Sequence, residues 1–272
     1  MIAPHGGWFD LNLGAVWEYR DLLWLFVRRD IVSYYKQTIL GPLWLIIQPI
    51  FTTIIYVLVF GKIAKLSTDG APQVVFYMCG IAFWNYFADC LGKTATVFRD
   101  NAGLFGKVYF PRLIVPISIV LSNVSRFLIQ FTLFLVIWGY YVVVGAVKPN
   151  WAILLFPVLV GTMAAIGLGS GLLFSAATTK YRDMLFLLHF GVQLMMYASP
   201  VIYPSSQIPE RIANVLKWNP LAPILETARY GFLGTGSFSW LGLAYSVSFA
   251  TVLLLASAAI FNKVERTFMD TV

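Results

Sequence analysis

Charged residues are scarce in this sequence. Only 11% of the 272 residues are Asp, Glu, Lys or Arg, whereas 59% are hydrophobic and 17% are aromatic. A typical soluble domain carries about 25% charged residues, so this chain has too few of them to cover a globular surface. The composition excludes an ordinary cytosolic enzyme, a disordered chain and a fibrous repeat, and it predicts an integral membrane protein.

Residues that build catalytic and metal sites are also scarce. The chain has two histidines and two cysteines, and Cys79 and Cys90 have a spacing that fits neither a zinc site nor a disulfide framework. A phosphate-binding loop needs a glycine five residues before its Gly-Lys-Ser/Thr end. Phe87 occupies that position ahead of Gly92-Lys93-Thr94. We therefore expect no catalytic residue, no metal site and no ATP hydrolysis in this chain.

Long apolar stretches fill most of the sequence. A helix needs about 20 predominantly apolar residues to cross a membrane. The third candidate has 33 residues and would form about 50 Å of helix, so it must tilt, break or extend beyond the membrane core of about 30 Å. The six candidate spans are residues 43–61, 74–98, 113–145, 151–179, 184–203 and 238–262.

The remaining segments predict a single membrane domain over residues 1–272. Apolar and charged residues interleave over residues 13–37, which is typical of an amphipathic helix on the membrane surface. A soluble helix packed on a partner is the alternative for this segment. We expect residues 1–40 to form this cytoplasmic or interfacial part, 41–262 the six-span bundle and 263–272 a cytoplasmic tail.

The segment 199–239, between the fifth and sixth spans, is punctuated by Pro204, Pro209, Pro220 and Pro223. Residues 210–217 and 225–232 can each form about two helical turns, which is too short to cross a membrane. We therefore predict a re-entrant or surface-lying helical hairpin on the periplasmic side.

The basic residues are unevenly divided between the segments that connect the spans. If the N-terminus is cytoplasmic, the inner segments hold eleven Lys and Arg residues and the outer segments hold six. Basic segments remain on the cytoplasmic side of a membrane, so we predict that both termini are cytoplasmic. The net charge of +7 then reports orientation in the membrane rather than binding to nucleic acid.

Three charged residues lie inside the candidate spans. Asp89 and Lys93 are four residues apart, so they share a helix face and can neutralise each other. Arg126 either has a function within the membrane or extends to its surface, and the sequence leaves both interpretations open.

Two candidate spans carry similar stripes of aromatic residues with one glutamine. The positions share a helix face because they follow an i, i+4, i+7, i+11 spacing. Aromatic rings can stack on the apolar faces of sugars while the amide bonds their hydroxyl groups, so such a face suits a sugar chain. The alternative is a seam of helix packing. The stripes are Trp44, Gln48, Phe51 and Ile55, and Phe186, Phe190, Gln193 and Tyr197.

Several local motifs resemble the permease subunit of polysaccharide-exporting ABC transporters, a family that moves O-antigen, capsule or teichoic acid. The resemblance extends over nearly the whole chain in order and spacing. The motifs are LGPLWLIIQP (40–49), FRDNAGLFGKVYFPRLIVP (98–116), KYRDM (180–184), SPVIYP (199–204) and NPLAPILETAR (219–229).

The resemblance implies a homodimer of six-span subunits in a bacterial inner membrane, docked to two copies of a separate ATPase that binds ATP and Mg²⁺. It implies that the first and fifth spans line a channel through Trp44, Gln48, Phe51, Tyr56, Phe186, Phe190, Gln193 and Tyr197. It also implies that the loop after the second span couples the permease to the ATPase through Asp100, Asn101, Phe105, Lys107, Phe110 and Pro111.

The sequence and the resemblance together predict an exporter of lipid-linked polysaccharide, with O-antigen as the favoured polymer. One alternative is an ABC permease for a small hydrophobic substrate such as a drug or haem. A membrane glycosyltransferase is the other, and it would need a cluster of acidic residues at the membrane face. The candidate acidic residues Asp100, Asp183 and Asp270 are instead scattered singly.

Overall fold

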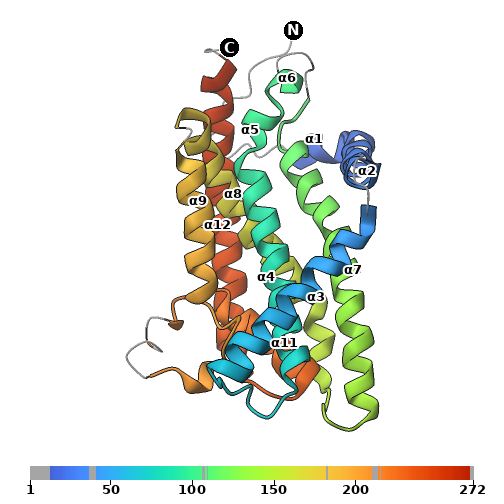
Figure 1. The fold of residues 1–272 in the computed structure, drawn as a ribbon. Coiled ribbons are helices and arrows are strands. Elements are labelled where there is room, and N and C mark those ends of the chain that lie inside the picture. The colour runs from blue at the N-terminus through green and yellow to red at the C-terminus, as the bar shows by residue number, and fades with distance from the viewer. Residues whose placement is uncertain are drawn as a thin grey trace.

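The computed structural model describes residues 13–36, 41–105, 108, 110–181, 183–209, 214 and 216–269. Within this part of the chain every regular element is a helix (Figure 1). Five helical segments are long and apolar enough to cross a membrane. This confirms the prediction of an all-helical, multi-pass membrane protein. The five are Trp44–Ile63, Gln73–Ala95, Ile114–Val143, Trp151–Thr178 and Trp240–Phe261.

The first span combines α3 (Trp44–Tyr56) with the wider helix η2 (Val57–Ile63). The others are α4 (Gln73–Ala95), α7 (Ile114–Val143), α8 (Phe156–Lys180) with the short η3 (Trp151–Leu155) before it, and α12 (Trp240–Met269).

The fifth predicted span, 184–203, forms the shorter helix α9 (Met184–Tyr197). Its 14 residues give about 21 Å of helix, less than the thickness of a membrane core. The helix ends just before Ser199-Pro200, and a residue that precedes proline is disfavoured in helical conformation. In Figure 1, α9 nevertheless carries the chain from the end where α8 finishes to the end where α11 (Ala222–Leu233) lies.

Helix α4 lies at the centre of the bundle, since 78% of the residues in its apolar stretch are buried. It packs against α8 through glycines that let the two backbones approach closely. A Cβ atom on Gly167 would lie 2.8 Å from the Cβ of Cys90, and one on Gly171 would lie 2.6 Å from the Cβ of Thr94. The small residues of α8 therefore serve helix packing, and both cysteines of the chain are buried and free.

The two ends of the bundle differ in structure (Figure 1). At one end lie α1 (Leu13–Glu18), the short helices α5 (Val97–Asp100) and α6 (Ala102–Phe105), and the last turns of α12. Helix α2 (Arg20–Lys36) lies across the bundle axis near this end, as expected of a helix on a membrane surface. At the other end lie η3, η4 (Ser205–Gln207) and α11.

The proline-rich segment is folded around one buried arginine. Most of the predicted short helix 210–217 lies outside the described residues, whereas 225–232 falls within α11. Arg229 is 1% exposed, and its guanidinium donates to the carbonyl oxygens of Val201 at 2.7 Å and Tyr203 at 3.2 Å. It also lies 3.9 Å from the centre of the Phe76 ring and 3.4 Å from a carboxylate oxygen of Glu226.

Glu226 is the second charged residue of this cluster. We call Glu226, Arg229 and the backbone groups that they bind the clasp. The Glu226 carboxylate accepts hydrogen bonds from the backbone N–H groups of Ser205 and Ser237, both at 3.2 Å. Burial lowers the pKa of the Arg229 guanidinium, and the neighbouring Glu226 carboxylate opposes that shift. The clasp therefore fixes the segment after α9 against α11 and α4.

Replacing Arg229 by alanine should lower the free energy of unfolding by about 3–5 kcal/mol, because Glu226 would remain buried without its cationic partner. Chemical denaturation of the purified protein in detergent would measure this loss. Lys217→Ala is a suitable control, since Lys217 is exposed and, among the described residues, its ammonium group donates to the nearby side chain of Asn214. Equal stability of the two variants would contradict the role of the clasp.

Candidate functional site

Three polar side-chain pairs connect α4 to α7 within the membrane-spanning part of the bundle. Asn85 donates to the amide oxygen of Gln130 at 3.4 Å, and Lys93 donates to that of Asn123 at 2.7 Å. Between them, Asp89 and Arg126 form an ion pair at 3.8 Å. We call these six residues the polar ladder. Such contacts satisfy polar groups that would be costly to leave unpaired among apolar side chains.

The sequence analysis found the three charged members of the ladder but not its arrangement. The spacing predicted that Asp89 and Lys93 share a helix face and can neutralise each other. Both line a hollow between α4 and α9, and Asp89 also forms an ion pair with Arg126 on another helix. The three amides, Asn85, Asn123 and Gln130, were missed. Their signal was present in the sequence, since Asn85 continues the four-residue spacing of Asp89 and Lys93 along α4.

Three hollows adjoin the polar ladder. A cavity of about 330 Å³ between α2, α4 and α7 is lined by both Lys93 and Arg126. A second, of about 180 Å³, lies between α3, α4 and α7 and includes Asp89 and Gln48. The third has about 760 Å³ and lies between α4 and α9, where Lys93 and Asp89 face Phe186 and His189. The ladder is therefore accessible from three sides.

The two predicted aromatic stripes are largely exposed on this single chain. Phe186 is 81% exposed, Phe51 62% and Phe190 60%, and Trp44, Tyr197, Gln48 and Gln193 are exposed as well. Glutamine amides facing lipid would have no hydrogen-bond partners. The exposed stripes on α3 and α9 are therefore surfaces that suit water, sugar or a second protein surface better than lipid alone.

Tyr56 lies apart from the exposed stripe of α3. It is half-buried, packs edge-on against Phe60 and Tyr77, and its hydroxyl donates to the sulfur of Met196 on α9 at 3.6 Å. This contact joins the two helices that carry the stripes. The resemblance grouped Tyr56 with the channel residues, and in this structure its hydroxyl group connects α3 with α9.

The predicted coupling loop divides into a buried and an exposed part. Phe105 and Phe110 are 3% and 5% exposed, and their rings are 6.0 Å apart. Asp100 is exposed and paired with Arg99 at 2.9 Å, while Asn101 donates to the carbonyl oxygen of Val97. Pro111 is half-buried, and Lys107 lies outside the described residues.

An aromatic cluster fixes this loop to distant elements. Phe110 packs edge-on against Phe26 of α2, with ring centres 5.7 Å apart, and Phe105 packs against Phe98 of α5. Phe98 in turn stacks on Phe261 of α12 at 4.6 Å. A displacement of the loop would therefore be passed directly to α2 and α12. Phe105 and Phe110 therefore stabilise the loop, whereas Arg99 and Asp100 lie exposed on it.

Among the residues that the structure describes, no three His, Cys, Asp or Glu side chains lie close enough together to hold a metal ion.

Comparison with known proteins places this geometry in context. A protein-family model described as "ABC-2 type transporter" matches residues 21–233. The chain is 27% identical over 260 residues to an O-antigen export system permease protein of Klebsiella pneumoniae, which covers 95% of this chain and 96% of that protein. Identity to the protein of the same description from Myxococcus xanthus is 27% over 259 residues, with 94% and 97% covered. A polysialic acid transport protein of Escherichia coli is 22% identical over 253 residues, with 89% and 93% covered.

Replacing Phe105 by alanine should lower the free energy of unfolding by about 3–5 kcal/mol, because it removes a buried ring from the aromatic cluster. The control is Val108→Ala, three residues away, where the side chain is exposed. It should change the free energy of unfolding by no more than about 0.5 kcal/mol. Denaturation of both purified variants tests this difference. If Phe105→Ala is as stable as Val108→Ala, the loop is not held by this cluster.

Proposed function

Because the chain belongs to the ABC-2 type transporter family, we propose that it is the membrane-spanning subunit of an ATP-driven exporter of lipid-linked polysaccharide. The observation that carries this proposal is the near full-length similarity to proteins described as transporters of two different sugar polymers. The relatives described as O-antigen permeases are the more similar of the two groups, so O-antigen is the favoured substrate.

The subunit works as a homodimer in a bacterial inner membrane, with both termini in the cytoplasm. The exposed stripes on α3 and α9 support a second copy, because the two copies together can enclose these surfaces away from lipid. The path of α9 between the two ends supports a sixth crossing, since α2 and the last turns of α12 lie towards the same end (Figure 1). The segment after α9 and helix α11 then form the periplasmic re-entrant part of a single domain.

The stripes provide the path for the polymer. Aromatic rings stack on the apolar faces of sugar rings, and Gln48 and Gln193 bond the hydroxyl groups. Many weak contacts, none of them a strong binding site, allow the polymer to keep moving along the path.

ATP and Mg²⁺ are bound by a separate ATPase, present in two copies, and this chain holds no cofactor. The loop formed by α5 and α6 meets that ATPase, with Asp100, Asn101, Lys107 and Pro111 at or near the contact. Phe105 and Phe110 lock the loop to α2 and α12, so a movement of the ATPase is transmitted as a rigid-body shift.

Replacing both Phe190 and Tyr197 by alanine should lower polymer export by up to about tenfold, because two stacking surfaces for sugar are lost. Assembly with the ATPase should stay intact, since both side chains are exposed and distant in sequence from the coupling loop. Export is measured as surface polymer in cells, and assembly by co-purification.

Phe249→Ala is the matched control, because Phe249 is an exposed aromatic residue on a different span, α12. Full export by the double variant, or an equal loss in the control, would contradict a path along α9.

Reversing the exposed charge at Asp100 to lysine should reduce both polymer export and stimulation of the ATPase, because charge complementarity guides such contacts. The same change at Lys107 to glutamate is expected to act likewise. Glu18→Lys tests a similar reversal on α1, at the same end of the bundle but outside the loop. Normal ATPase stimulation in the two loop variants would argue against this loop as the contact.

A further inference from the structure

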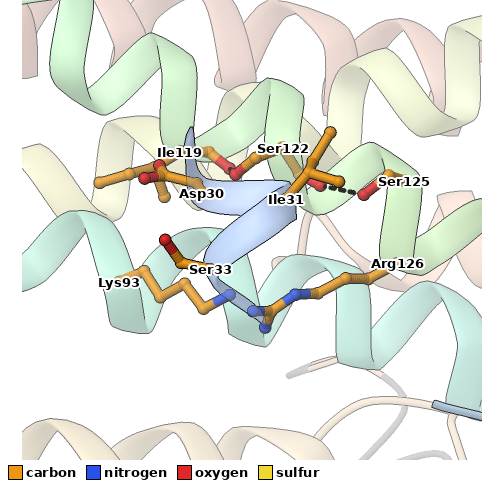
Figure 2. A pocket seen from close by; sticks show the side chains of 8 residues that line it. All are labelled: Asp30, Ile31, Ser33, Lys93, Ile119, Ser122, Ser125 and Arg126. Carbon is orange, nitrogen blue, oxygen red and sulfur yellow. Dashed lines mark hydrogen bonds between the residues drawn. The ribbon is translucent and has the colours of Figure 1, made fainter. Parts of the chain in front are cut away.

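The cavity of about 330 Å³ brings together side chains from three helices (Figure 2). Lys93 extends from α4 and Arg126 from α7, and Figure 2 shows their charged ends directed toward each other beneath the end of α2. Asp30 and Ser33 line the cavity from α2, and Ser122 and Ser125 line it from α7.

The convergence of two cations is the feature that requires explanation. Like charges that lie close together within an apolar bundle repel each other and are costly unless anions offset them. Asp89 offsets part of this charge, but its carboxylate is 46% exposed and 3.8 Å from the guanidinium of Arg126. Asp30 is already paired with Arg29 at 2.8 Å. Among the described residues that line this cavity, two are cations, Lys93 and Arg126, and one is a carboxylate, Asp30.

We infer that this cavity binds the phosphate or diphosphate headgroup of a membrane lipid. The inference rests on the proposed function, in which the polymer is carried on a lipid, and it assigns that lipid's headgroup a place in this chain. Lys93 and Arg126 neutralise the headgroup, and Arg126 can donate two parallel hydrogen bonds to its oxygens.

The donors that face the cavity suit an anion. The ammonium group of Lys93 also donates to Asn123, and it has further hydrogen atoms to offer. Ser33 adds a hydroxyl group from α2. The hydroxyl groups of Ser122 and Ser125 are occupied, since each donates to a carbonyl oxygen of its own helix, at 2.8 and 2.7 Å.

Size and position favour a lipid headgroup over a free solute. The cavity, with a volume of about 330 Å³, is large enough to admit a diphosphate group. It lies against α2, the helix that crosses the bundle axis as a surface helix does, so its depth is that of a lipid headgroup.

The cavity also adjoins the proposed path of the polymer. Lys93 lines both this cavity and the hollow of about 760 Å³ between α4 and α9, whose lining includes Phe186 of the aromatic stripe. A headgroup held at Lys93 therefore places the first attached sugar beside the start of that stripe.

The test is a binding titration with the purified chain in nanodiscs of phosphatidylcholine. Geranylgeranyl diphosphate is the probe, geranylgeraniol lacks the anion, and inorganic diphosphate lacks the tail. We expect saturable binding of the probe alone, weakened about tenfold or more in Lys93→Gln and in Arg126→Gln. Lys36→Gln, which removes an exposed charge at the end of α2, should bind as the wild type does.

The outcomes separate the possible ligands. If inorganic diphosphate binds as tightly as the probe, the cavity is a site for a free anion. If phosphatidylglycerol competes as strongly as the probe binds, the cavity is a site for bulk anionic lipid. Either result would overturn a site for the carrier lipid. Unchanged binding in both cavity variants would overturn the site itself. The Arg126→Lys variant keeps a positive charge opposite Asp89. Retained binding in this variant would show that the loss in Arg126→Gln comes from the missing charge and not from misfolding.

Polymer export in cells distinguishes this inference from the proposed function. If the wild type exports polymer and both cavity variants export it equally well, the headgroup site is wrong and the exporter stands. If the wild type exports no polymer, the proposed function itself fails, whatever the binding data show.

Discussion

The polar ladder between α4 and α7 is the constraint on which the arrangement of the bundle depends. Charged and amide side chains within apolar spans are stable only when partners are held within reach, and Asn85, Asp89 and Lys93 find theirs on α7. Helix α4 is therefore fixed on this face by polar contacts and on its α8 face by close packing at Gly167 and Gly171. The other helices surround this rigid pair and present their exposed faces outward.

Hydropathy was sufficient to predict the helical spans, because a chain that crosses a membrane must satisfy its backbone within each segment. It was less informative about length. Residues 184–203 are predominantly apolar and carry no Asp, Glu, Lys or Arg, yet α9 stops at Tyr197, since the chain must turn at Ser199-Pro200 and then meet Arg229. Apolar composition predicts that a segment is helical but does not record where tertiary contacts bend it.

The candidate site could be predicted only in part, for a related reason. Periodicity identified residues that share a helix face, and the exposed stripes of α3 and α9 agree with it. It could not identify which neighbouring helix each face meets. Tyr56 is joined to Met196 and Phe105 is buried in the aromatic cluster, although the family resemblance grouped both with residues expected to meet substrate or partner. Pairings between helices depend on three-dimensional packing, which one sequence does not reveal.

The chain holds two ionic sites of opposite character. In the clasp, Arg229 is almost fully buried and is bonded to two carbonyl oxygens, an aromatic face and a carboxylate. Removing any partner there leaves an uncompensated buried charge, so the site is fixed. At the ladder, the ion pair of Asp89 with Arg126 is longer and half open to its surroundings. The guanidinium of Arg126 has five N–H donors, so it can contact a phosphate group while it remains beside Asp89. The end of the bundle at α11 thus has the more buried ionic site, and the headgroup site that we infer lies beside the more open one.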